Sequence, residues 1–111
     1  MYIDMNDISD ASQYSVAAHP GEILLYEYME PAGISESDIA RAMSVPLYQV
    51  NEIIKGERRI SADTALRLSM VLAGTTVQFW LNVQNTCDIL ALEPVKEKIC
   101  REVVPLPFIV A

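Results

Sequence analysis

The sequence has few of the features that mark secreted, membrane or metal-binding proteins. Its two cysteines, Cys87 and Cys100, are too few for a disulfide scaffold and lack the C-x-x-C spacing typical of zinc sites, so we expect free thiols. No apolar run approaches the roughly 18 residues that a membrane-spanning helix needs. The first fifteen residues hold three aspartates and no Lys or Arg, unlike a secretory signal. We therefore expect a cytoplasmic protein with no membrane partner and no metal.

The sequence also lacks a recognisable catalytic constellation. The single histidine, His19, precedes Pro20 and the start of a predicted helix, where a capping or packing role is expected over general-base catalysis. Neither cysteine has a nearby base with triad spacing, and the four glycines form no phosphate-binding loop. We predict a protein that is not an enzyme, with no cofactor and no small-molecule substrate.

Positive charge is scarce and unevenly distributed. Eight basic and fifteen acidic residues give a net charge of −7, which by itself disfavours a nucleic-acid partner. Residues 1–40 carry eight acids and no Lys or Arg, whereas residues 41–67 carry five bases and three acids. Because exposed charges more than about 8 Å apart are largely screened at physiological salt, a small positive region can face DNA while the acidic part faces solvent or a basic partner. The alternative is an acidic soluble protein in which the charges cluster by chance.

The apolar pattern predicts a small helical protein. A chain of 111 residues, 51% of them hydrophobic, is expected to form one globular domain. Apolar residues recur at helical spacing between capping and breaking residues, which predicts an all-α fold with helices at about 20–30, 35–43, 46–54, 62–73 and 76–92. Residues 1–18 lack periodicity and are expected to form a flexible N-terminal arm. Residues 93–111 are expected to form a short C-terminal extension that ends in an extended segment, because Pro105 and Pro107 exclude helix there.

Local signals set the expected helix starts and stops. Ser35 and Asp38 fit a capping box, Ser61 is a plausible N-cap, and Thr75 or Thr76 caps the last helix. Pro46 suits the first position of the third helix, which Gly56 should stop.

The second and third predicted helices form a helix-turn-helix candidate, because only about two residues join them. Val50, Ile53 and Ile54 lie on one side of the third helix, which leaves a polar outer face. Asn and Gln side chains can pair with adenine, Glu can accept from cytosine, and Tyr or Leu can touch a thymine methyl group. We predict base-reading residues at Leu47, Tyr48, Gln49, Asn51 and Glu52, and phosphate contacts at Lys55, Arg58 and Arg59. The alternative is an ordinary solvated helix face, and Glu52 would repel phosphates unless a cytosine or an arginine pairs with it.

The fifth predicted helix is apolar around more than half of its circumference, which is wider than the stripe of a typical surface helix. Either the helix is central to the core or it also packs on a second subunit. We expect a homodimer whose interface includes Val77, Trp80, Leu81 and Gln84.

The runs "HPGEILLYEYMEPAGIS" and "VNEIIKGERRISADTALRLSMVLAGTTVQFWLNVQN" resemble HigA-type antitoxins, also called plasmid-maintenance antidote proteins. These belong to the XRE group of lambda-repressor-like helix-turn-helix proteins. The resemblance covers roughly residues 19–92, the expected helix-turn-helix domain. It implies a five-helix domain, a homodimer, a palindromic operator in double-stranded DNA, and often neutralisation of a toxin that cleaves messenger RNA. It places the recognition helix on residues 46–54 and adds the start of the second helix, Ser35 and Glu36, to the expected phosphate contacts.

The expected function is therefore that of a DNA-binding antitoxin that represses its own operon and binds a basic toxin. One alternative is a solitary XRE-type regulator with no toxin. Another is an interaction module that sequesters a toxin and binds DNA weakly, which the eight acids of the first forty residues favour.

Overall fold

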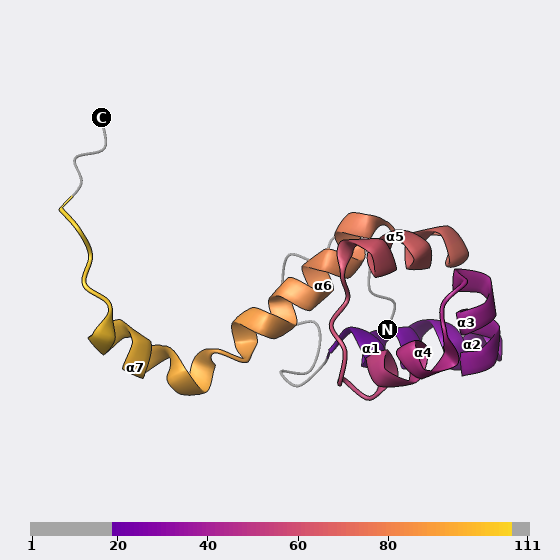
Figure 1. Cartoon of the computed structure of the whole chain (residues 1–111), viewed down its shortest axis with the longest axis horizontal. Coiled ribbons are helices and arrows are strands. Elements are labelled where there is room, and N and C mark those ends of the chain that lie inside the picture. Colours follow the sequence, from indigo (N-terminus) through magenta and orange to yellow (C-terminus); the bar gives the residue numbers. More distant parts are fainter. Residues whose placement is uncertain (1–18, 108–111) are drawn as a thin grey trace.

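The computed structural model describes residues 19–107 and contains only helices and connecting segments in that range (Figure 1). The predicted arm at 1–18 and residues 108–111 lie outside the described residues. The all-α class predicted from the sequence is confirmed. Among residues 19–107, no helix is both long enough and apolar enough to cross a membrane.

The first helical stretch is continuous but changes its winding twice. It begins as α1 (Pro20–Ile23), widens into a π-helical turn, η2 (Leu24–Met29), and closes as α2 (Glu30–Ala32). The wider turn immediately precedes Pro31, whose ring would clash with the carbonyl four residues back in an α-helix. Gly33, at φ +66°, then ends the stretch in the left-handed conformation that glycine adopts without strain.

The next helices begin where their caps predict. The hydroxyl group of Ser35 accepts from the backbone N–H of Asp38, whose carboxylate accepts from the backbone N–H of Ser35, so the predicted capping box is present at the start of α3 (Glu36–Met43). Ser61 caps α5 (Ala62–Val71), and Thr76 caps α6 (Val77–Leu90). These side chains satisfy backbone N–H groups that have no partner within the helix.

The C-terminal extension contains a helix that the sequence analysis did not assign, α7 (Glu93–Glu102). Pro94 lies in its first turn, where its missing N–H costs nothing. Ion pairs one helical turn apart support it, Lys98 with Glu102 and Arg101 with Glu97. In Figure 1, α6 leaves the helical body at one end and α7 continues away from it.

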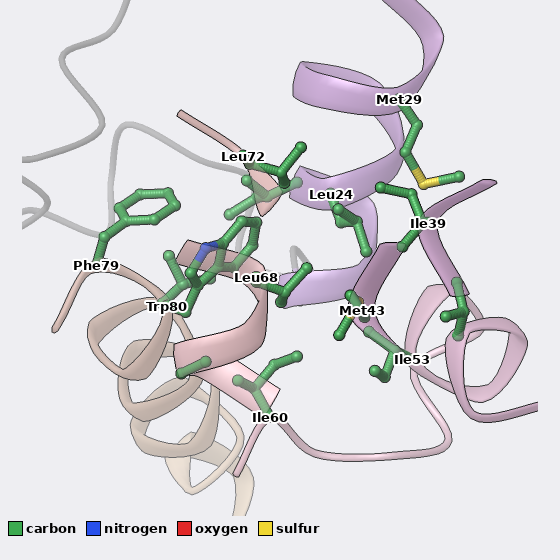
Figure 2. Close-up of a cluster of buried hydrophobic side chains, with 14 of the residues drawn as sticks. Leu24, Met29, Ile39, Met43, Ile53, Ile60, Leu68, Leu72, Phe79 and Trp80 are labelled. Carbon is green, nitrogen blue, oxygen red and sulfur yellow. The ribbon is translucent and has the colours of Figure 1, made fainter. Parts of the chain in front are cut away.

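The core lies between α1, η2, α3, α4 (Leu47–Ile54), α5 and α6. Its largest fully buried side chain is that of Trp80, whose ring lies 4.9 Å from that of Phe79 and 5.7 Å from that of Tyr28, centroid to centroid. Figure 2 shows these α6 aromatics beside Leu68 of α5 and Leu72, the residue that follows α5, with Leu24 of η2 opposite. Burial of this cluster supplies the main stabilisation of the fold and holds α4 against α1 and α3.

Candidate nucleic-acid interface

The helix-turn-helix consists of α3 and α4, joined by residues 44–46. Ser44 adopts a left-handed conformation, φ 59°, and the backbone N–H of Val45 donates to the carbonyl of Ala40, which makes the sharp turn. Pro46 is extended and serves as the N-cap of α4, so the helix starts one residue later than predicted. The short, hydrogen-bonded connection fixes the angle between the two helices.

One side of α4 packs against the other helices of the core. Val50 and Ile53 are fully buried against them. Gly21 of α1 lies so close that a Cβ atom added there would be 1.9 Å from the carbonyl oxygen of Ile53. No role was predicted for Gly21, although this glycine lies at the start of the run "HPGEILLYEYMEPAGIS" that carries the family resemblance.

The other side of α4 carries the five predicted base-reading residues. Leu47 and Tyr48 are more than half exposed, unusual for large apolar side chains. Gln49, Asn51 and Glu52 are half-buried. The structure therefore places all five on the part of α4 that the core does not cover.

Asn51 is oriented by the start of α3. Its Nδ2 donates to Oε1 of Glu36 at 3.1 Å, which links the two helices of the motif. Pairing with adenine needs both the donor and the acceptor of an asparagine amide. To pair with adenine in this way, Asn51 must therefore break its hydrogen bond with Glu36 and form hydrogen bonds with the base instead.

Glu52 has an arginine partner within the protein. The Nε and Nη2 atoms of Arg58 each lie 2.8 Å from Oε1 of Glu52. The Cζ atom of Arg58 lies 5.9 Å from the centre of the Tyr48 ring. Glu52 is thus neutralised locally, and Arg58 lies directly beside the outer face of α4. The sequence predicted that Glu52 would repel phosphates unless a cytosine or an arginine paired with it, and Arg58 is such an arginine.

The neighbouring residue Arg59 has its partner on a different helix. Its guanidinium pairs with the carboxylate of Asp88 on α6 at 2.5 Å. Lys55, at the end of α4, is exposed and has no carboxylate partner among residues 19–107. The three cations that the sequence grouped as phosphate contacts therefore have three different environments.

The start of α3, where a further phosphate contact is expected, carries negative charge. The pKa of Asp38 is lowered, first because the backbone N–H of Ser35 donates to its carboxylate, and further because of the Ser35 hydroxyl and the nearby Arg41. Asp38 and Glu36 thus occupy the helix end that would otherwise attract a phosphate. The hydroxyl group of Ser35, which was expected to contact a phosphate, accepts from the backbone N–H of Asp38 and so caps α3.

Two of the four predicted dimer residues are inside the protomer. Trp80 is fully buried in the core, and the side chain of Gln84 is buried, with its Oε1 accepting from the backbone N–H of Ile60 at 2.8 Å. Neither offers surface to a second subunit, which corrects the prediction for these two positions. The sequence does not show that the backbone N–H of Ile60 is the buried partner of Gln84. Val77 and Leu81 are half-buried and retain exposed area.

A hollow of ≈ 180 Å³ lies behind the segment that carries the arginines. His19 lines it and caps α1, with its Nδ1 accepting from the backbone N–H of Gly21 at 3.0 Å, which confirms the capping role predicted for it. Cys87 also lines the hollow, and burial together with the nearby Asp88 raises the pKa of its thiol. Within residues 19–107, no group of His, Cys, Asp and Glu side chains is arranged to hold a metal ion.

Comparison with known proteins decides the family. The helix-turn-helix family model matches residues 25–80, from η2 to the first turn of α6. The chain belongs to this helix-turn-helix family. The XRE-type resemblance seen in the sequence is confirmed.

The similar members of the helix-turn-helix family include regulators and antitoxins. Virulence-associated protein I of Dichelobacter nodosus is 45% identical over 83 residues, which cover 75% of this chain and 76% of that protein. The structure of antitoxin GraA is 41% identical and superposes with a TM-score of 0.77, covering 81% of this chain and 97% of GraA. Pseudomonas aeruginosa antitoxin HigA, solved with the higBA promoter, is 38% identical with a TM-score of 0.74, covering 81% of this chain and 98% of HigA. This chain is thus an antitoxin-like, DNA-binding helix-turn-helix protein.

Proposed function

We propose that this protein represses its own operon by binding operator DNA as a homodimer, with α4 as the recognition helix. The observation that supports this most directly is the clamped geometry of α4. One side is locked on the body through Gly21, Val50 and Ile53, while the other presents exposed Leu47 and Tyr48 beside polar side chains. The P. aeruginosa HigA structure, which contains promoter DNA, supports the same use of the fold.

In this proposal, the outer face of α4 enters the major groove. Leu47, Tyr48, Gln49, Asn51 and Glu52 lie at base edges, and Lys55 and Arg58 anchor the phosphate backbone. Two copies of α4 about 34 Å apart would enter successive major grooves on one side of the duplex. The exposed parts of Val77 and Leu81 on α6 are the proposed contacts between subunits.

The experiment is a fluorescence-anisotropy titration against the chain's own upstream DNA at several salt concentrations. The slope of log K against log salt is negative, and removing one phosphate contact reduces its magnitude by about 1. Lys55→Ala is therefore expected to weaken binding on all sequences and to flatten this slope, whereas Lys98→Ala on α7 serves as a control with the same charge change. Equal binding by wild type and Lys55→Ala would refute the phosphate contact, and salt-insensitive binding by the wild type would refute the whole proposal.

A second component of the proposal is neutralisation of a toxin that cleaves messenger RNA. The antitoxin names of GraA and HigA support it, as do the eight acids and absent bases of residues 1–40, which complement a basic protein. Copurification with the product of an adjacent small basic reading frame tests it. Without such a neighbour, a solitary regulator is the better description. If the chain copurifies with a toxin but does not bind operator DNA in the titration, it is a toxin-sequestering module.

A further inference from the structure

Two adjacent arginines pair with acids on two different helices. Arg58 pairs with Glu52 of α4, on the proposed DNA-facing side, whereas Arg59 pairs with Asp88 of α6. Helix α6 carries none of the candidate base-reading residues. The sequence gives both arginines the same expected role, but their surroundings differ.

Asp88 belongs to a short network that reaches the backbone of the α4–α5 connection. Its Oδ2 pairs with Arg59, while its Oδ1 accepts from Nε2 of Gln84 at 3.0 Å. The Oε1 of Gln84 in turn accepts from the backbone N–H of Ile60 at 2.8 Å, in a buried position. Two consecutive residues of the connection, 59 and 60, are thus attached to α6 through side chains one helical turn apart.

Within the connection, Ile60 is buried in the core, whereas residues 56–59 border a hollow. The hollow of ≈ 180 Å³ lies between residues 56–59, the start of α1 and the face of α6 that carries Asp88. At the other end of the connection, the ring of His19 lies against Gly56, where an added Cβ would come within 2.9 Å of Nε2. Beside this hollow, the contact of Gly56 with His19, the Arg59–Asp88 pair and the burial of Ile60 fix the path of the segment that carries Arg58.

We propose that Asp88 and Gln84 are positioning residues for DNA binding, and that Arg59 serves as their tether and not as a phosphate contact. Through Arg59 and Ile60 they hold the α4–α5 connection on α6, which places Arg58 beside the recognition helix. This inference rests on the proposed DNA-binding function. It assigns a binding role to residues of α6, a helix that carries none of the candidate base-reading residues.

The two roles for Arg59 predict opposite effects of removing Asp88. If Arg59 tethers the connection, Arg59→Ala and Asp88→Ala each weaken operator binding by about 3- to 10-fold, a range typical of residues that act through others. The double variant then binds no worse than either single variant, because both changes break the same link. If Arg59 instead contacts phosphate, Asp88→Ala tightens binding, because it removes the carboxylate that competes with phosphate for Arg59.

Anisotropy titrations of full-length protein against its upstream DNA measure these effects, with Glu97→Ala on α7 as the control for loss of one exposed acid. Tighter binding by Asp88→Ala than by the Glu97→Ala control would overturn the inference.

Amide hydrogen exchange gives a readout without DNA. The N–H of Ile60 is expected to exchange faster in Asp88→Ala, while amides in the core of α5 keep their wild-type protection. Unchanged exchange at Ile60 would contradict the tether. A wild-type protein that does not bind the DNA would refute the proposed function, and in that case the exchange measurement still decides whether the tether exists.

Discussion

Replacing Gly21 with alanine tests the packing that presents the recognition helix. An added Cβ would lie 1.9 Å from the carbonyl oxygen of Ile53 and 2.7 Å from Cα of Ile54. Restoring an ordinary contact of 3.4 Å requires a separation of about 1.5 Å (3.4 − 1.9) between α1 and α4. The obstructing atoms are backbone, so a side-chain rotation cannot relieve the clash.

The expected cost follows from that geometry. Overpacking a core costs about 1–3 kcal/mol, and we expect the upper end, about 3 kcal/mol, because two helices must separate. For a helical body of this size, about 1 kcal/mol shifts Tm by roughly 4–8 °C, which gives a decrease of roughly 12–24 °C. Because α4 moves with the clash, operator binding is expected to weaken even at temperatures where the variant stays folded.

Gly33→Ala is the matched control. Gly33, unlike Gly21, has a positive φ, +66°, and an added Cβ there has no atom within 4 Å. Its cost is therefore conformational, about 1 kcal/mol, with no change in DNA affinity. Thermal unfolding by circular dichroism compares the two variants. A Gly21→Ala protein that melts no lower than Gly33→Ala would refute the close approach of α1 and α4.

Three further predictions concern charge. Glu52→Gln removes the carboxylate beside Arg58 and is expected to tighten binding to non-specific DNA several-fold in a salt titration; unchanged affinity would mean that phosphates do not approach this face. Because the pKa of Asp38 is depressed from 3.8 in the folded state, its charge stabilises the fold above that pH, and the effect disappears as the pH falls through the lowered pKa. Asp38→Asn is thus expected to be less stable than wild type to urea at pH 7 and equal to it at low pH; a gap independent of pH would contradict this. The pKa of Cys87 is raised by burial, so mass spectrometry is expected to show slower alkylation by iodoacetamide at Cys87 than at exposed Cys100, and equal rates would argue against that burial.

Helix starts could be predicted from the sequence because capping is local. Ser35, Ser61 and Thr76 each accept from a backbone N–H three residues ahead, so the signal lies within four residues of chain. The same holds for the turn between α3 and α4 and for the buried side of α4. Local signals were therefore sufficient to place the helix-turn-helix.

The helix α7 was missed for a different reason. Pro105 and Pro107 predicted an extended end, and the part of the extension before them was assigned no secondary structure. Pro94 could have been interpreted as a first-turn proline, followed by Glu and Lys at helical spacing. The apolar periodicity alone did not separate this helix from a tail.

Contacts between distant segments could not be predicted. Nothing near Arg59 in the chain indicates Asp88, and nothing near Gln84 indicates the backbone N–H of Ile60. Both contacts depend on how α5 packs against α6, which a single sequence does not specify. For this reason the prediction assigned the same role to two arginines with different partners.

These pairings also bear on how an acidic protein can discriminate between DNA sequences. Non-specific binding comes almost entirely from phosphate electrostatics. In the free protein Arg58 already pairs with Glu52, so a phosphate that recruits it must displace a carboxylate. This displacement weakens binding to every sequence equally, whereas contacts of the α4 side chains with base edges strengthen binding only at the operator. On the proposed function, the net charge of −7 and the paired arginine lower non-specific affinity and leave specificity to the outer face of α4.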